Sequence, residues 1–223
     1  MAGPAHAPVE VTISLTGLKG ILRVPEAARG IVIFAHGSGS GRLSPRNNHV
    51  AEGLREAGIA SLLVDLLSPE EELDRANVFD IPLLASRLSG TAEWVAREPD
   101  LWSLPIGYFG ASTGGGAALL AASYEDDRAV AVVSRGGRPD LAGAHALARV
   151  RAPTLLIVGG HDHVVIDLNR TAMRHMHART ELIIVPGAGH LFEEPGTLDA
   201  VIGHATDWFL QHFEEAWHAR QPA

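Results

Sequence analysis

The chain has 223 residues, of which 46% are hydrophobic and 20% are charged, and its formal net charge is -8. A chain of this length can form a single domain over residues 1–223 with a substantial core, and its acidic balance makes nucleic acid and acidic membrane surfaces unexpected partners. Because the sequence contains no cysteine, disulfides, a thiolate nucleophile and thiolate metal ligands are excluded.

Strand-like and helix-like segments alternate along the chain. Residues 9–15 and 20–24 are short, partly apolar segments that we expect to pair as antiparallel strands. Further strands are expected at residues 31–35, 59–66, 106–110, 129–134, 154–158 and 181–185, and helices at 45–58, 80–96, 114–120, 140–148, 165–176 and 197–219. Residues 67–79 are expected to form an exposed connection with a single helical turn. The alternation predicts an α/β fold with a mostly parallel sheet, covered by helices on both faces.

A strand, a sharp turn and a helix follow one another in residues 106–120, IGYFGASTGGGAALL. The turn contains Gly110-x-Ser112-x-Gly114, a pattern in which small neighbours allow a strained turn that exposes the serine hydroxyl above the sheet. The first amides of the following helix point toward the same place. In this context we interpret Ser112 as a nucleophile; the alternative is a tight turn that merely contains a serine.

Residues that follow the other strands should meet Ser112 at the carboxyl edge of the sheet. Asp162 follows the strand that ends at residue 158, and His190 lies in the loop after the last strand, so the chain order is nucleophile, acid, base. A serine hydroxyl needs a histidine to accept its proton and a carboxylate to orient that imidazole. We therefore assign Ser112, Asp162 and His190 as a catalytic triad, and Asp140 is the competing acid.

Ester hydrolysis also requires two amides directed at the developing oxyanion. The Thr113 amide, directly after the nucleophile, is expected to be the first. The second is expected in the HGSGSG loop at residues 36–41, where we choose Ser38 and keep Gly39 as the alternative.

Several motifs together resemble the α/β-hydrolase superfamily: the elbow, the HGSGSG loop, GGHD at residues 159–162 and GAGH at residues 187–190. SPRN (44–47), FDIPLL (79–84) and SRGGRPDLAG (134–143) further resemble its dienelactone-hydrolase-like branch, and the likeness spans residues 30–215. The resemblance implies a serine ester hydrolase. Dienelactone hydrolases proper use a cysteine at the position of Ser112, so dienelactone is not the expected substrate.

Only about 20 residues separate the strands at 129 and 154, which leaves no space for a cap domain. We therefore expect small or short-acyl carboxylic esters as substrates, cleaved through an acyl-enzyme. Arg42, Arg46, Arg135 and Arg138 lie in loops at the predicted site face. One alternative is that they pair with acids such as Asp65 or Asp140. The other is that they bind an anionic group of the substrate, for which Arg42, Arg135 and Arg138 are the candidates. The alternative functions are a lactone or thioester hydrolase acting on an anionic substrate and a non-catalytic binding module.

Two rival classes fit the sequence less well. A dinucleotide site at residues 37–41 lacks the third glycine, which is Arg42. The pairs His161/His163 and His175/His177 do not suggest one shared metal, because the second pair is expected on different faces of a helix. We therefore expect no metal and no cofactor. With no basic, apolar leader and no run of about 18 apolar residues, we expect a cytoplasmic protein with a small-molecule ester substrate; the oligomeric state stays open, a homodimer included.

Overall fold

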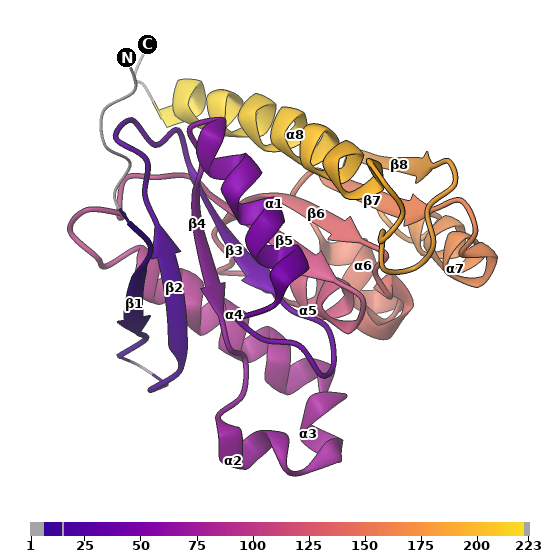
Figure 1. Ribbon diagram of the computed structural model, residues 1–223, viewed down its shortest axis with the longest axis horizontal. Helices are drawn as coiled ribbons and strands as arrows, with labels where there is room; N and C mark the ends of the chain where they lie inside the picture. Colours follow the sequence, from indigo (N-terminus) through magenta and orange to yellow (C-terminus); the bar gives the residue numbers. More distant parts are fainter. Residues whose placement is uncertain (1–6, 15, 221–223) are drawn as a thin grey trace.

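The computed structural model describes residues 7–14 and 16–220. Within them, eight strands form one sheet in the order β1-β2-β4-β3-β5-β6-β7-β8 (Figure 1). The strands are β1 (Val9–Thr12), β2 (Lys19–Arg23), β3 (Ile31–Ala35), β4 (Ala60–Val64), β5 (Ile106–Ala111), β6 (Ala129–Arg135), β7 (Thr154–Gly159) and β8 (Thr180–Val185). β1 and β2 run antiparallel to their neighbours, and every pairing from β4 to β8 is parallel. The predicted mostly parallel sheet is confirmed; Leu15, the predicted end of the first strand, lies outside the described residues.

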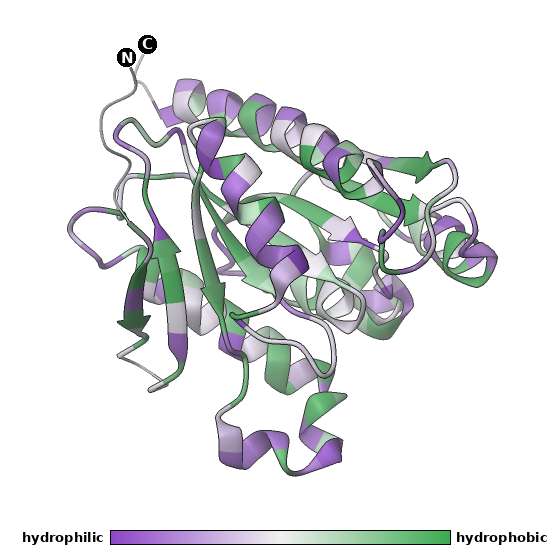
Figure 2. Ribbon diagram, in the orientation of Figure 1, coloured by the Kyte–Doolittle hydropathy of each residue, from purple (hydrophilic) through white to green (hydrophobic). Residues whose placement is uncertain are grey.

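Helices cover the sheet on both faces (Figure 1). One face carries α1 (Pro45–Glu56) and α8 (Thr197–Arg220); the other carries α4 (Ile81–Val95), α5 (Thr113–Ala121), α6 (Ala144–Arg149) and α7 (His163–Met173). The buried apolar side chains accordingly form two large clusters, one under α1 and α8 and the other under α4, α5 and α6. Strands β3 to β7 are buried on both faces over most of their length, and their sequences are mostly apolar; Figure 2 shows most of these strands in the green of hydrophobic residues.

The aromatic side chains of α8 anchor this helix to the sheet. Trp208, Phe209 and Phe213 are buried, as their helical spacing predicts, and the rings of Phe209 and Phe213 stack with centroids 5.6 Å apart. Trp217 differs, since it is 36% exposed and its indole N–H donates to the Arg29 carbonyl at 3.0 Å. Among the described residues, no helix is sufficiently long and apolar to cross a membrane.

The structure differs from the sequence-based prediction mainly at the ends of elements. Residues 67–79 form two single-turn helices, α2 (Pro69–Glu72) and α3 (Arg75–Val78), because Ser68 and Asp74 each cap a separate turn. Helix α7 begins at His163 and ends at Met173, whereas a helix over residues 165–176 was predicted. Asp80, at the start of the predicted helix over residues 80–96, caps α4 and accepts a hydrogen bond from the Leu83 amide at 2.9 Å.

Candidate active site

Ser112 occupies a strained turn between β5 and α5. Its φ of 51° and ψ of -120° lie in a region that residues with a side chain rarely adopt. The flanking glycines allow this turn: a Cβ on Gly110 would lie 2.5 Å from the Gly114 carbonyl oxygen, and one on Gly114 would overlap with the Ala35 carbonyl group. The local sequence therefore places the hydroxyl of Ser112 at the carboxyl edge of the sheet for steric reasons.

The structure brings the three predicted triad residues together from three separate loops. His190 Nε2 lies 3.4 Å from Ser112 Oγ, and His190 Nδ1 lies 2.6 Å from Asp162 Oδ2. An imidazole that donates from Nδ1 to the carboxylate presents its Nε2 lone pair to the serine hydroxyl. The competing acid, Asp140, instead accepts two hydrogen bonds from Arg138 and does not contact His190. Of the two acids, Asp162 is thus the one that pairs with the histidine.

The loop that carries His190 is held from two sides. Phe192 adopts a φ of 54° and buries its ring in the core below α8. Glu194 accepts a hydrogen bond from the Gly189 amide at 3.0 Å, and this contact lowers the pKa of the Glu194 carboxyl group. Ser112 and Phe192 are the two non-glycine residues with positive φ in the described part of the chain. Sequence reasoning missed both Phe192 and Glu194, because neither belongs to a recognisable pattern.

The loop at residues 36–41 lies beside the elbow, but its amides are not all free. The Ser38 amide donates to the Thr113 hydroxyl at 2.9 Å, and its use as an oxyanion donor stays a prediction. The Thr113 amide belongs to the first residue of α5 and therefore has no acceptor within the helix. His36 fixes the loop, since its Nε2 accepts from the Leu66 amide at 3.0 Å and its Nδ1 lies 3.0 Å from the Gly37 carbonyl oxygen. Sequence analysis did not assign this role to His36.

The site arginines fall into two groups. Arg42 pairs with Asp65 through both its backbone amide and its guanidinium group, and Arg138 forms two hydrogen bonds with Asp140, at 2.9 and 2.7 Å. Both therefore pair with the acids that the sequence analysis named as alternatives to a substrate group, and a role in substrate binding stays a prediction. Arg135, at the end of β6, is 7% exposed, and its Nε and Nη1 atoms have no hydrogen-bond partner in the described structure. Burial lowers the pKa of Arg135 to about 10, with a smaller contribution from the charge of Arg46.

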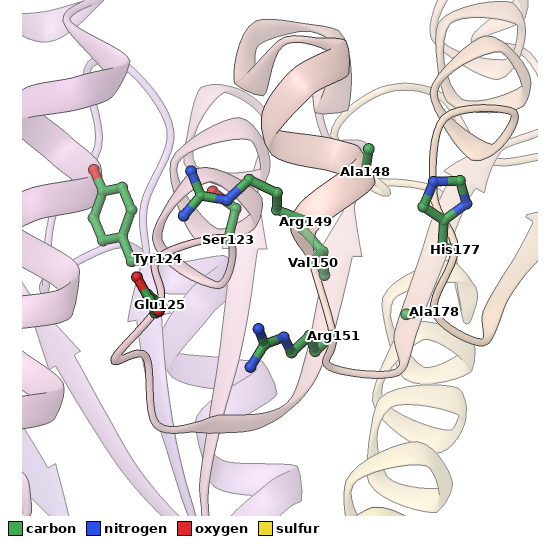
Figure 3. Close-up of a pocket in the computed structure, with 9 residues that line it drawn as sticks. All are labelled: Ser123, Tyr124, Glu125, Ala148, Arg149, Val150, Arg151, His177 and Ala178. Carbon is green, nitrogen blue, oxygen red and sulfur yellow. The ribbon is translucent and has the colours of Figure 1, made fainter.

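Two cavities lie at opposite ends of the sheet. A cavity of about 120 Å³ borders the Ser38 and Gly39 loop and is otherwise lined largely by apolar side chains, among them Leu67, Val78 and Leu84. A larger cavity of about 780 Å³ lies at the amino ends of β7 and β8, where Figure 3 shows Arg149, Arg151 and His177 around it. No residue of the triad lines either cavity.

The histidine pairs considered as metal ligands do not assemble into a site. His175 and His177 follow the end of α7, so the helix on which they were expected to lie does not include them. In residues 7–14 and 16–220, no three His, Cys, Asp or Glu side chains are arranged to hold a metal ion.

Comparison with known proteins agrees with this geometry. Residues 5–201 match the model of the alpha/beta hydrolase family. Dienelactone hydrolase from Anabaena variabilis is 54% identical and superposes with a TM-score of 0.87, covering 93% of this chain and 99% of that chain. Two curated proteins named putative phosphoribosyl transferase, from two strains of Mycobacterium tuberculosis, are 60% identical over 204 residues, which is 92% of this chain and 46% of each of those proteins. The chain thus spans about half the length of these curated relatives.

A more distant relative is named probable 2-oxo-3-(5-oxofuran-2-ylidene)propanoate lactonase, from Bradyrhizobium sp. It is 27% identical over 166 residues, covering 65% of this chain and 66% of that protein. The family match and the Anabaena structure together establish the membership: this chain belongs to the alpha/beta hydrolase family, in its dienelactone-hydrolase-like branch.

Proposed function

We propose that this protein hydrolyses small carboxylic esters through an acyl-enzyme on Ser112. The observation that carries the proposal is the chain of contacts from Ser112 Oγ to His190 Nε2, at 3.4 Å, and from His190 Nδ1 to Asp162, at 2.6 Å. The first distance is long for a hydrogen bond, and such contacts commonly shorten when substrate binds. A strained serine, a base and an oriented carboxylate are the three parts that nucleophilic ester hydrolysis needs.

The geometry supports two steps that share one base. Ser112 Oγ attacks the ester carbonyl carbon while His190 Nε2 takes its proton, and the tetrahedral intermediate collapses by releasing the alcohol, which receives that proton. Water then attacks the acyl group with His190 again acting as base, and the acid leaves with Ser112 restored. Throughout, Asp162 holds the imidazole in the tautomer that presents Nε2 to the serine.

Backbone amides stabilise the negative charge of the intermediate. The Thr113 amide is the first donor, at the positive end of α5. For the second, the oxyanion either replaces the Thr113 hydroxyl as acceptor of the Ser38 N–H, which now donates to it at 2.9 Å, or uses the Gly39 amide. Both alternatives place the oxyanion between the loop at residues 36–41 and the elbow.

Cavity size supports a short acyl group. Two cavities border Ser38 and Gly39. One, of about 580 Å³, is lined mostly by polar and charged residues, and the apolar one measures about 120 Å³, with Leu67, Val78 and Leu84 in its wall. A buried methylene contributes roughly 0.8 kcal/mol of hydrophobic free energy only if it can enter such a space. A C4 acyl chain should therefore be cleaved faster than a C12 chain.

Two of the relatives' names suggest other substrates. The Bradyrhizobium protein is named a lactonase, and a lactone is an internal ester that the same triad can open, so lactone hydrolysis is the second candidate. The name phosphoribosyl transferase belongs to two longer proteins, and the part that matches this chain makes up 46% of the length of each. Because this chain carries the triad geometry, we propose hydrolysis and not phosphoribosyl transfer for it.

A matched pair of serine variants tests the proposal. Ser112→Ala removes the proposed nucleophile, whereas Ser123→Ala changes a serine of the larger cavity, shown in Figure 3. With p-nitrophenyl acetate, kcat/KM should fall by at least about 10³-fold in Ser112→Ala, since the triad acts as a unit, and should stay within about threefold of wild type in Ser123→Ala. Wild-type activity in a folded Ser112→Ala protein would overturn the proposal.

A further inference from the structure

Asn169, in the middle of α7, is a buried polar side chain that the proposed chemistry does not use. It is 0% exposed, and its Nδ2 donates to the carbonyl oxygens of Gly137, at 3.0 Å, and of Val165, at 2.8 Å. Because both partners are carbonyl oxygens, the reverse orientation of the amide group would place oxygen against oxygen. Its Oδ1 has no hydrogen-bond partner within the described residues. A buried oxygen without a partner lowers stability, so the two donated hydrogen bonds are what this side chain contributes.

The hydrogen bond to Gly137 reaches the backbone of Ser112 through one peptide group. The carbonyl group of Gly137 and the amide of Arg138 belong to the same planar unit. The Arg138 amide donates to the Ser112 carbonyl oxygen at 3.0 Å. Asn169 therefore holds one end of this peptide group and Ser112 holds the other, so a rotation of its plane would break a hydrogen bond at each end.

The Ser112 carbonyl group in turn orients the first proposed oxyanion donor. The carbonyl of Ser112 and the amide of Thr113 form a second planar peptide group. The Ser112 oxygen accepts from the amides of Arg138 and Gly115, each at 3.0 Å. The Thr113 N–H has no acceptor within α5, because Thr113 is the first residue of that helix. The direction of this N–H is thus set by the contacts that the Ser112 oxygen makes.

The loop that carries Gly137 is packed closely against the elbow. A Cβ on Gly137 would overlap with the Ser134 hydroxyl group, and one on Gly115, in the first turn of α5, would lie 2.9 Å from the Gly137 Cα. The Gly136 amide donates to the Ile157 carbonyl oxygen at 2.7 Å, which ties the loop to β7. With so little free space, a displacement of the Gly137 peptide group is passed on to the backbone of the elbow.

Helix α7 also follows the acid of the triad. Asp162 directly precedes the helix, and its carbonyl oxygen accepts from the Ile166 amide at 2.9 Å. Its carboxylate makes no capping hydrogen bond and pairs with His190 at 2.6 Å. The contacts of Asn169 involve neither Asp162 nor His190. An effect on the oxyanion donor can therefore be separated from an effect on the base.

We propose that Asn169 is a positioning residue for the oxyanion site. It holds the Gly137–Arg138 peptide group, which holds the Ser112–Thr113 peptide group with its N–H directed at the developing oxyanion. The proposal rests on the hydrolase function proposed above. All donors in this series point the same way, from Asn169 toward the oxyanion, so each hydrogen bond polarises and strengthens the next. An oxyanion donor acts on the tetrahedral intermediate and not on the bound ester, so its misalignment lowers kcat and leaves KM nearly unchanged.

Replacing the amide by an apolar side chain of similar size tests the proposal. Asn169→Leu removes both hydrogen bonds. Thr91→Val is the control, because it removes another buried hydrogen bond, from the Thr91 hydroxyl to the Arg87 carbonyl at 2.8 Å, in α4. With p-nitrophenyl acetate, kcat should fall by about 10-fold or more in Asn169→Leu, with KM within about twofold of wild type, and both should stay within about twofold in Thr91→Val. Thermal unfolding shows that the variants are folded, and Asn169→Ala replaces Asn169→Leu if the latter is not. An unchanged kcat in the folded variant would overturn the proposal.

A charged tetrahedral adduct gives the readout that a loss of stability alone would not move. A trifluoromethyl ketone adds to a nucleophilic serine as an anionic hemiketal, so its Ki depends on the oxyanion donors. The Ki of phenyl trifluoromethyl ketone should rise in Asn169→Leu by the factor by which kcat/KM falls, and should stay at the wild-type value in Thr91→Val. An unchanged Ki would overturn the proposal, as would a shifted pH profile of kcat/KM, which would place the effect on His190. A wild-type protein that the ketone does not inhibit would instead contradict the hydrolase function itself, and this inference with it.

Discussion

The two ends of the sheet differ in a way that cavity size does not reveal. The amino ends of β7 and β8 border the larger space, about 780 Å³, but Arg149, Arg151 and His177 around it (Figure 3) are exposed side chains free to be solvated. The carboxyl edge borders smaller spaces, of about 580 and 120 Å³, yet carries a strained serine and a buried arginine without a partner. Strain and unpaired charge cost stability, so they persist where function requires them.

The largest effect should come from the carboxylate at the carboxyl edge. Asp162→Asn keeps the shape of the side chain but allows the wrong imidazole tautomer, so kcat should fall by about 10⁴-fold. Steady-state hydrolysis of p-nitrophenyl acetate measures this fall in kcat, with Asp140→Asn and Arg151→Ala as controls. Asp140 pairs with Arg138 and Arg151 lines the larger cavity, so both controls should stay within about fivefold of wild type. A fall in the kcat of Arg151→Ala by more than this factor would contradict the functional difference between the two ends of the sheet.

The steric crowding at the elbow predicts the next largest effect. Gly114→Ala places a methyl group against the Ala35 and His36 carbonyl groups and should lower the free energy of unfolding by about 1–3 kcal/mol or more. Gly203→Ala, in an exposed part of α8 with open space around it, should raise the free energy of unfolding by about 0.5–1 kcal/mol. Urea denaturation of both variants measures the difference, and equal effects would contradict the steric account of the elbow.

The smallest effect concerns the strain at Ser112. Glycine adopts a φ of 51° without penalty, so Ser112→Gly should raise the free energy of unfolding by about 1 kcal/mol while abolishing hydrolysis. Ser123→Gly at the other end should lower it by about 1 kcal/mol, because the Ser123 hydroxyl donates to the Leu120 carbonyl at 2.7 Å. Thermal unfolding of the two variants tests whether the free energy of unfolding changes in opposite directions. A destabilised Ser112→Gly protein would show that the turn is not strained.

Much of this architecture could be predicted because its signals are local. The elbow needs two glycines at set positions, the buried strands need apolar runs, and Asp80 before α4 is a clear cap. The order nucleophile, acid, base pointed to Asp162 and His190, and in the structure His190 lies between Ser112 and Asp162. Here the spacing of residues along the chain was sufficient.

What could not be predicted depends on tertiary partners. Arg42, Arg135 and Arg138 look alike in the sequence, and only the folded chain shows that two have carboxylates and one has none. The Ser38 amide was assigned from its place in the loop, but the Thr113 hydroxyl, 75 residues away, accepts its hydrogen bond. The ends of α7 differ from the prediction by two residues at its start and three at its end, because helix ends are the least precisely specified part of a helix.

The most direct measurement of the central claim is covalent labelling of the nucleophile. Wild-type protein is treated with a fluorophosphonate, digested, and analysed by tandem mass spectrometry; Ser112→Ala is treated in parallel. The account predicts one adduct per chain, on Ser112, and no labelling of the variant, because the other serines lack the adjacent His190 base. An adduct on another residue, or an unlabelled wild-type protein that still hydrolyses esters, would contradict it.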